Sequence, residues 1–280
     1  MIDVLELLAR QPGGVPLAEL TRMLGLTKGT AHAILSTLRD RGWVTRDPID
    51  RTLSLGPALG IAAATIDRVR PLASAARVMA VGIAEDIGEA VSVVERVGDS
   101  IVIVAFEGGT GEHRATPGDR VPFGAPLGLG FAAWSPEEVR RRWIERGAGD
   151  DPALAGRLTE LIDVTRRRGY TVERMSPTYV QTAQLMATLR DDELSEPVRR
   201  AVDAMLADLT AIVLQTDHRA GVVTAIAAPV FDERAQAILN IAVHPSRSLS
   251  DGELDTMGRR LAHDCRRVTE SVRDQIPNRD

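Results

Sequence analysis

The chain has one cysteine, Cys265, and one lysine, Lys28, among its 280 residues. A single cysteine cannot form an internal disulfide, which excludes a disulfide-stapled fold and predicts a reducing compartment, the cytoplasm. No apolar run approaches the roughly 20 residues that cross a bilayer, so we expect no membrane partner. Asp3 and Glu6 fall within the first amphipathic stretch, and we therefore expect no secretory signal there.

The usual signatures of catalytic and metal sites are also missing from the sequence. Gly108-Gly109-Thr110-Gly111 follows an expected strand but opens no helix, which favours a hairpin turn over a phosphate-binding loop. His113, His218 and His244 lack the spacing of zinc ligands. Cys265 is in phase with apolar residues of an expected helix, which predicts a core position. We therefore expect no catalytic residues, no metal and no cofactor.

Residues 17–55 have the pattern of a winged helix-turn-helix. Leucines at helical spacing lead to Gly25, which suits a turn, and Thr27 is a good cap for a second helix. Two short strand patterns around the polar turn 47–51 follow. The apolar face of the second helix is expected to comprise Ala31, Ile34, Leu35 and Leu38. This pattern predicts a DNA-binding head, and the alternative is a small helical core without a ligand.

The outer face of the second helix is the expected DNA-reading surface, because a major groove admits one α-helix. Base contacts specify a sequence, whereas phosphate contacts position the protein. Residues 1–56 hold seven basic and six acidic residues, so non-specific affinity should be modest and two copies on one DNA would help. We expect base contacts from Lys28, Thr30, His32 and Ser36, and phosphate or minor-groove contacts from Arg46 and Arg51.

The remainder of the chain predicts an α+β domain on an antiparallel sheet, because strand patterns share one region with helical ones. Residues 57–70 form an expected linker helix, a natural place for self-association, and Pro71 begins a longer helix to about Ile87. Strands are expected at 90–97, 100–107, 170–174, 222–231 and 236–243, and further helices at 136–147, 153–168 and 251–274.

The order of these parts resembles the IclR family of transcriptional regulators. The resemblance is carried by 26–32, 41–44 and 53–56 in the head, and by 118–122, 168–170 and 226–232 in the second domain. It implies a winged helix-turn-helix at 1–56, a linker helix at 57–70 and a GAF-like effector-binding domain at 71–280. It also implies a homodimer or tetramer that binds a pseudo-palindromic operator in double-stranded DNA, and an effector that controls promoter binding. We expect a repressor.

Two departures from the family pattern affect these expectations. Gly29 and Ala33 stand where relatives usually have Ser and Arg, so the alternative is a ligand-sensing or protein-interaction module whose helix-turn-helix no longer reads DNA. A helical insertion at about 176–219 is the second departure. Tyr179–Leu189 and the apolar residues from Val198 to Val213 have helical spacing. The insertion could be a lid over the pocket, an extra dimer surface or a decorative bundle.

The resemblance also implies where an effector binds. Relatives that sense small carboxylates offer two serines from the last strand, and we match these to Ile241 and Val243. The lost polar groups predict a relatively apolar or aromatic acid, because a polar ligand would leave its groups unpaired. A one-residue error in this alignment would exchange the faces of the strand. The expected effector site comprises Phe123, Leu127, Gly128, Leu129, Glu173, Ala225, Ile241 and Val243.

Overall fold

The computed structural model describes residues 1–11, 13–109, 115–174, 195–215 and 222–273. Contacts within the chain divide it into two units, Met1–Pro71 and Leu72–Asp280. Each unit has its own apolar core and is described by itself. Within the described parts, no helix is both long and apolar enough to span a membrane.

The first unit is a winged helix-turn-helix, as the sequence predicts. Its elements are α1 (Ile2–Ala9), α2 (Leu17–Met23), α3 (Lys28–Asp40), β1 (Val44–Arg46), β2 (Leu53–Leu55) and α4 (Ala58–Val69). Gly25 adopts a φ of 62° in the turn between α2 and α3, a region that glycine enters without steric cost. Thr27 caps α3, since its hydroxyl accepts a hydrogen bond from the Thr30 amide at 3.2 Å.

The core of this unit contains the apolar residues that the helical spacing singled out. Leu20, Leu35 and Leu38 pack together with Val4 and Leu8 of α1. Further members are Val15, Val44 and Leu53, so the two wing strands contribute to the same core. The core therefore fixes α3 with its polar face outward.

The second unit is built on a six-stranded antiparallel sheet in the order β5-β4-β3-β8-β7-β6. The strands are β3 (Ala90–Val97), β4 (Ser100–Glu107), β5 (Arg120–Pro122), β6 (Thr171–Glu173), β7 (Ala225–Phe231) and β8 (Ala237–His244). The antiparallel α+β prediction is confirmed. The short edge strand β5 was not predicted.

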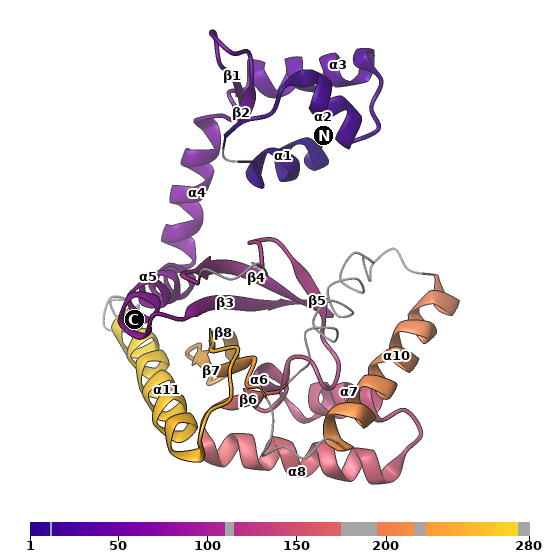
Figure 1. Ribbon diagram of the computed structural model, residues 1–280, viewed down its shortest axis with the longest axis vertical. Helices are drawn as coiled ribbons and strands as arrows, with labels where there is room; N and C mark the ends of the chain where they lie inside the picture. Colours follow the sequence, from indigo (N-terminus) through magenta and orange to yellow (C-terminus); the bar gives the residue numbers. More distant parts are fainter. Residues whose placement is uncertain (12, 110–114, 175–194, 216–221, 274–280) are drawn as a thin grey trace, which may run out of the picture. The chain divides into compact units, whose positions relative to one another are not determined.

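Helices cover both faces of this sheet (Figure 1). They are α5 (Pro71–Ile87), α6 (Leu129–Ala132), α7 (Glu137–Ala148), α8 (Pro152–Arg168), α10 (Glu196–Gln215) and α11 (Asp251–Arg273). On one face, α5 and α11 pack on Val91, Val93 and Ile226 in a core that includes Cys265, as predicted. On the other face, α6, α7 and α8 enclose a second core around Phe131 and Trp143.

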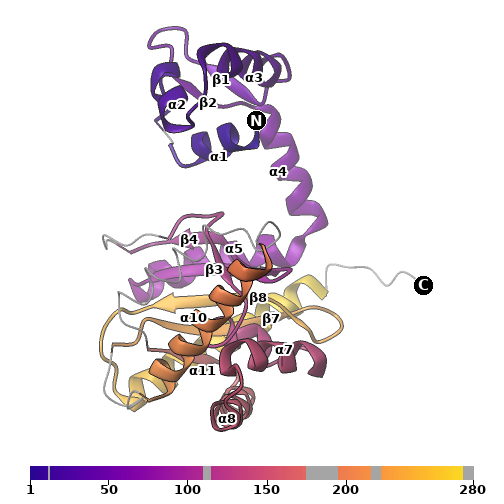
Figure 2. The same ribbon diagram turned by 90° about the vertical axis from the view of Figure 1, so that its right-hand side faces the viewer.

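The part of the insertion that the structure describes is helical. α10 covers the predicted apolar repeat from Val198 to Val213 and runs beside α7 (Figure 2). Val202 and Leu206 pack on Leu127 in a small separate core. The helix predicted at Tyr179–Leu189 lies outside the described residues.

Candidate functional site

The predicted base-reading residues all lie exposed on α3. Lys28, Thr30, His32 and Ser36 are exposed, whereas Ala31, Leu35 and Leu38 are buried. At 100° per residue, His32 and Ser36 share one flank of the helix with Lys28, and Thr30 lies on the opposite flank. The Thr30 hydroxyl lies 2.9 Å from that of Thr27 and is therefore part of the cap.

The outermost line of α3 consists of small residues. Gly29 and Ala33 lie opposite the buried face, and a Cβ added at Gly29 would meet no atom within 4 Å. Thr37, which the sequence reasoning missed, is exposed on the same flank as Thr30, although its hydroxyl already donates to the Ala33 carbonyl. The helix surface is therefore slim at its centre and polar on both flanks, a shape that can enter a major groove.

The wing is a turn whose own side chains hold it in place. Asp47 Oδ1 accepts hydrogen bonds from the amides of Ile49 and Asp50. Asp50 in turn accepts bonds from the Thr52 amide and hydroxyl, which lower the pKa of its carboxyl. Arg51 adopts a φ of 62°, and its carbonyl accepts a bond from Arg46 Nε at 3.1 Å. Both arginines are exposed near this ordered tip, where phosphates could be reached.

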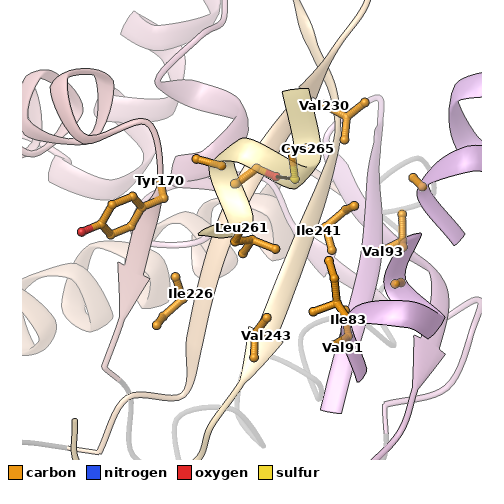
Figure 3. Packing of buried hydrophobic residues seen from close by; sticks show 14 of the residues in the cluster. Ile83, Val91, Val93, Tyr170, Ile226, Val230, Ile241, Val243, Leu261 and Cys265 are labelled. Carbon is orange, nitrogen blue, oxygen red and sulfur yellow. Dashed lines mark hydrogen bonds between the residues drawn. The ribbon is translucent and has the colours of Figure 1, made fainter. Parts of the chain in front are cut away.

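The expected effector residues do not all come together. Ile241 and Val243 of β8 are fully buried in the core between the sheet and α5 and α11 (Figure 3). Phe123 and Leu129 belong to the core on the other face, and Leu127 packs beneath α10. Ile241 and Val243 are two positions apart and share the face of β8 that packs on α5 and α11, so, contrary to the expectation, they do not share a cavity with Phe123, Leu127 and Leu129.

The strand register identifies the residues that do face away from α5 and α11. Residues directly opposite one another in antiparallel strands share a face. Thr171 pairs with Ala227, Ala227 with Ala242, Ala242 with Ser92, and Ser92 with Phe106. These residues form one row across five strands, with alanines at its centre. Neighbouring rows on the same face contain Asn240, His244, Ala225 and Glu173. We use the name polar sheet face for these nine residues: Thr171, Ala227, Ala242, Ser92 and Phe106 of the row, with Asn240, His244, Ala225 and Glu173.

Asn240 is the most informative residue of the polar sheet face. Its side chain is 2% exposed, and neither Oδ1 nor Nδ2 has a hydrogen-bond partner in the part of the chain that the structure describes. A buried amide without partners is costly, at roughly 1–3 kcal/mol for each unsatisfied group. Such a group in a native protein requires an explanation, and one is a ligand that supplies a donor and an acceptor.

Ser92 and His244 form a hydrogen-bonded pair on the same face. The distance between Ser92 Oγ and His244 Nε2 is 2.8 Å, and His244 Nδ1 lies 3.1 Å from the Thr224 carbonyl. A carbonyl only accepts, so Nδ1 carries the proton and Ser92 donates to Nε2. Burial lowers the pKa of His244 and keeps the ring neutral, while Phe106 stacks on it. The Ser92 oxygen therefore retains lone pairs that can accept from a ligand.

Glu173 supplies the acidic group of this face. It ends β6 opposite Ala225, and its removal from water raises the pKa of its carboxyl to about 7. At neutral pH the side chain is thus partly protonated and can either donate or accept. Arg174, the next residue, has a buried Nε without a partner among the described residues.

The predicted loop residues fold into a tightly packed support. Gly128 adopts a φ of 80°, and a Cβ there would lie 2.7 Å from Ile101 Cδ1 and 2.8 Å from Phe123 Cδ2. Trp143 Nε1 donates to the Leu127 carbonyl at 2.7 Å, and the Leu127 amide donates to the Gly124 carbonyl at 2.8 Å, so both backbone groups of Leu127 are already paired. This loop therefore has a structural role, since it is packed between Ile101, Phe123 and Trp143.

Comparison with known proteins agrees with this architecture. The IclR helix-turn-helix domain model matches residues 1–48. The glycerol operon regulatory protein of Streptomyces coelicolor is 28% identical over 198 residues, which cover 67% of this chain and 76% of that protein. The chain therefore carries an IclR helix-turn-helix domain and is similar to curated transcription regulators over two thirds of its length. A second relative, the DNA-binding transcriptional repressor YiaJ of Escherichia coli, is 30% identical over 166 residues, or 56% of this chain and 58% of that protein.

Solved structures of IclR proteins share the fold of this regulator. The Thermotoga maritima IclR superposes with a TM-score of 0.62 at 15% identity, covering 96% of both chains. An IclR homolog from Microbacterium hydrocarbonoxydans, solved in complex with 4-hydroxybenzoate, gives a TM-score of 0.57 at 16% identity, covering 92% of both chains. The helix-turn-helix match and the curated relatives support DNA-binding transcription regulation, and the solved structures support the fold.

Proposed function

We propose that this chain is an IclR-family repressor whose promoter affinity is controlled by a small molecule bound on the polar sheet face. The observation that carries the proposal is Asn240, a buried amide that lacks partners among the described residues. The same face offers the neutral Ser92–His244 pair and the desolvated Glu173 carboxyl. Polar groups that converge at a buried surface are the usual mark of a ligand site.

The chemistry of these groups defines the effector class. Asn240 offers one donor group and one acceptor, Ser92 offers an acceptor, and Glu173 in its protonated form offers a donor. The alanines at 225, 227 and 242 leave an apolar floor between them. A small acid with a further hydroxyl matches this pattern, and Phe106 could stack on a ring. The relatively apolar acid expected from Ile241 and Val243 is therefore replaced by a more polar one.

DNA binding by this regulator requires two copies on one operator in our proposal. α4 has no buried residue, and Ile61, Ile66 and Val69 are 74%, 47% and 69% exposed. These residues lie within half of the helix circumference and form an apolar stripe. Such a stripe supports association with α4 of a second chain, giving a homodimer that matches a pseudo-palindromic operator.

Effector control then follows from differential binding. An effector changes operator affinity only if it binds more tightly to one arrangement of the two heads than to another. In the DNA-bound chain we place Lys28, Thr30, His32 and Ser36 at base edges, with Arg46 and Arg51 at the backbone. We place the regulator in the cytoplasm, where its DNA is, and assign it no catalytic step.

The test measures release of the regulator from operator DNA by small hydroxy acids, with 4-hydroxybenzoate as the first probe. Fluorescence anisotropy of labelled DNA is followed as each acid is added to the wild type and two variants. Asn240→Leu should abolish release, whereas Ile241→Leu on the opposite face should retain it. Equal loss in both variants, or release by no member of the panel, would contradict the proposed site.

A further inference from the structure

Helix α4 is attached to the rest of its unit at one end only. No residue of α4 is buried, and the residues from Gly60 to Ile66 are all exposed. Ala58 and Leu59, which begin the helix, are half-buried. The angle between α4 and the rest of this unit is therefore set by the contacts of its first turn.

Backbone hydrogen bonds join this first turn to the end of α3. The Gly42 carbonyl accepts a bond from the Ala58 amide at 3.0 Å, and the Trp43 carbonyl accepts one from the Gly56 amide at 2.7 Å. The Trp43 amide donates in turn to the Leu38 carbonyl of α3 at 2.9 Å. The first amides of a helix lack partners within it, so the segment that ends α3 supplies an acceptor that α4 needs at its start. We call the contact of Gly42 and Trp43 with Gly56 and Ala58 the α3–α4 joint.

Gly56 permits this joint because it has no side chain. A Cβ added at this buried residue would lie 2.2 Å from the Gly42 oxygen, 2.8 Å from the Gly42 carbonyl carbon and 2.9 Å from that of Trp43. All three are backbone atoms, which cannot rotate aside as a flexible side chain does. Any other residue at this position would therefore push α4 away from the end of α3. At Gly60, one turn further along α4, an added Cβ meets no atom within 4 Å.

The joint lies at the opposite end of α3 from Lys28, so a small change of angle has a large effect there. Gly42 follows Lys28 by 14 residues, which corresponds to about 21 Å along a helix axis. A tilt of about 10° at the joint would therefore displace Lys28 by roughly 3.6 Å, close to the rise of about 3.4 Å between base pairs. A loose joint would misplace the base-reading side chains by about one base-pair step.

We propose that Gly56 is a positioning residue for operator recognition: it lets α4 begin against the Gly42 carbonyl and so holds α3 at one angle to α4. This inference rests on the proposed function, in which α4 pairs two copies of the chain on one operator. Two such joints then set the separation of the two reading helices, and half-sites at that separation bind both heads at once. Gly56 itself does not touch DNA and acts through α3.

A comparison of two DNAs tests this role in the full-length protein. One is the segment upstream of the gene that wild type protects from nuclease, and the other is the same segment with one half-site scrambled. Gly56→Ala should weaken binding to the intact segment about tenfold or more, because the two heads lose their fixed separation. Binding to the single half-site should stay within about threefold, because each α3 keeps its own reading surface. Gly60→Ala, the matched control, should behave as wild type on both DNAs.

The comparison separates positioning from a merely structural role. Equal weakening of Gly56→Ala on both DNAs would show that the glycine only supports the fold of the head, and would overturn the proposal. Unchanged binding to the intact segment would overturn it as well. Wild type that binds neither DNA, or both alike, would instead refute the two-copy operator of the proposed function.

A distance measurement tests the α3–α4 joint without DNA. Nitroxide labels are placed on Ser36→Cys of α3 and Ala64→Cys of α4, both exposed positions, while the native Cys265 is fully buried. Excess unlabelled protein ensures that only one chain of a pair carries labels. Pulsed electron spin resonance should give one narrow distance in this protein and with Gly60→Ala added, and a shifted or broader distribution with Gly56→Ala. A distribution unaltered by Gly56→Ala, or already broad without it, would overturn the proposal.

Discussion

Asn240 of β8 lies directly against Gly130 of α6: a Cβ added at Gly130 would be 2.5 Å from Asn240 Oδ1 and 3.0 Å from its Cγ. The glycine therefore makes room for the buried amide, and no larger residue fits beside it without movement. The close approach ties α6 to the polar sheet face on which we place the effector. A ligand bound to Asn240 in the proposed site would therefore lie close to α6.

Gly130→Ala should therefore destabilise the regulator. Because the added methyl would clash with Asn240, we expect a loss of about 1–3 kcal/mol in the free energy of unfolding, as for other overpacked sites. Urea denaturation measures the change. The matched control is Gly156→Ala in α8, where an added Cβ meets nothing within 4 Å. That substitution should be neutral or stabilise by about 0.4–1 kcal/mol, and equal destabilisation in both variants would refute the assigned contact.

Glu173 should make stability depend on pH in a defined direction. Burial raises the pKa of its carboxyl from 4.5 to about 7, so the folded state favours the protonated form. The stabilising contribution is complete below the unfolded pKa and is lost as pH rises through the folded one. Relative to wild type, Glu173→Gln should gain up to about 3 kcal/mol at pH 8 and little at pH 4. Urea denaturation of both proteins at pH 4 and pH 8 measures the difference in unfolding free energy. A difference that is the same at both pH values would contradict the raised pKa of Glu173.

The apolar stripe on α4 should hold two copies of the chain together as a dimer. Ile61→Asp and Val69→Asp together place two charges where we expect a second chain, and they should shift the dimer toward smaller species. Light scattering after gel filtration measures the mass. Because both residues are exposed, circular dichroism should show the variant to be as fully folded as Ala64→Asp, its control on the same helix. Unchanged mass would show that dimers form elsewhere.

The Ser92–His244 pair should influence effector response but not DNA affinity. Ser92→Ala removes the donor to Nε2 and the acceptor that we assign to the ligand. We expect about a tenfold higher acid concentration for half-release of DNA, since a lost hydrogen bond is worth roughly 0.5–1.5 kcal/mol. DNA affinity without acid should stay within twofold of wild type. If DNA affinity falls while the response to acid is unchanged, the Ser92–His244 pair has a structural role and does not bind the effector.

The head was predictable because its signals are local. Thr27, Gly25 and the leucines of α2 and α3 specify a cap, a turn and a core within a few residues of each other, and the structure has each of them. Most strands of the second unit were predicted within one to three residues for a similar reason, since β3 and β4 are bounded by a tight turn. Thr37 was not predicted to be exposed, because the exposure of a residue at the side of a helix depends on how the helix packs on the rest of the core.

The orientation of β8 was not predictable from its own residues. Both faces of this strand are covered, so apolar residues occupy both, and the alternation that normally identifies the buried face is absent. The site that we propose lies one residue away from Ile241 and Val243 in β8, and a shift of one residue in a strand exchanges its faces. Asn240 was the available signal, because a single amide within an apolar run has to satisfy its polar atoms somewhere.

DNA binding by α3 and the wing tests the account most directly. Anisotropy of DNA from upstream of the gene, with excess non-specific competitor at two salt concentrations, compares wild type with Lys28→Ala/Arg46→Ala. Arg234→Ala, an exposed change in the second unit, is the charge-matched control for one lost cation. We predict saturable binding that survives competitor and weakens with salt, with a smaller salt dependence only in the double variant. Binding that is absent, or equal in all three proteins, would contradict the assigned reading surface.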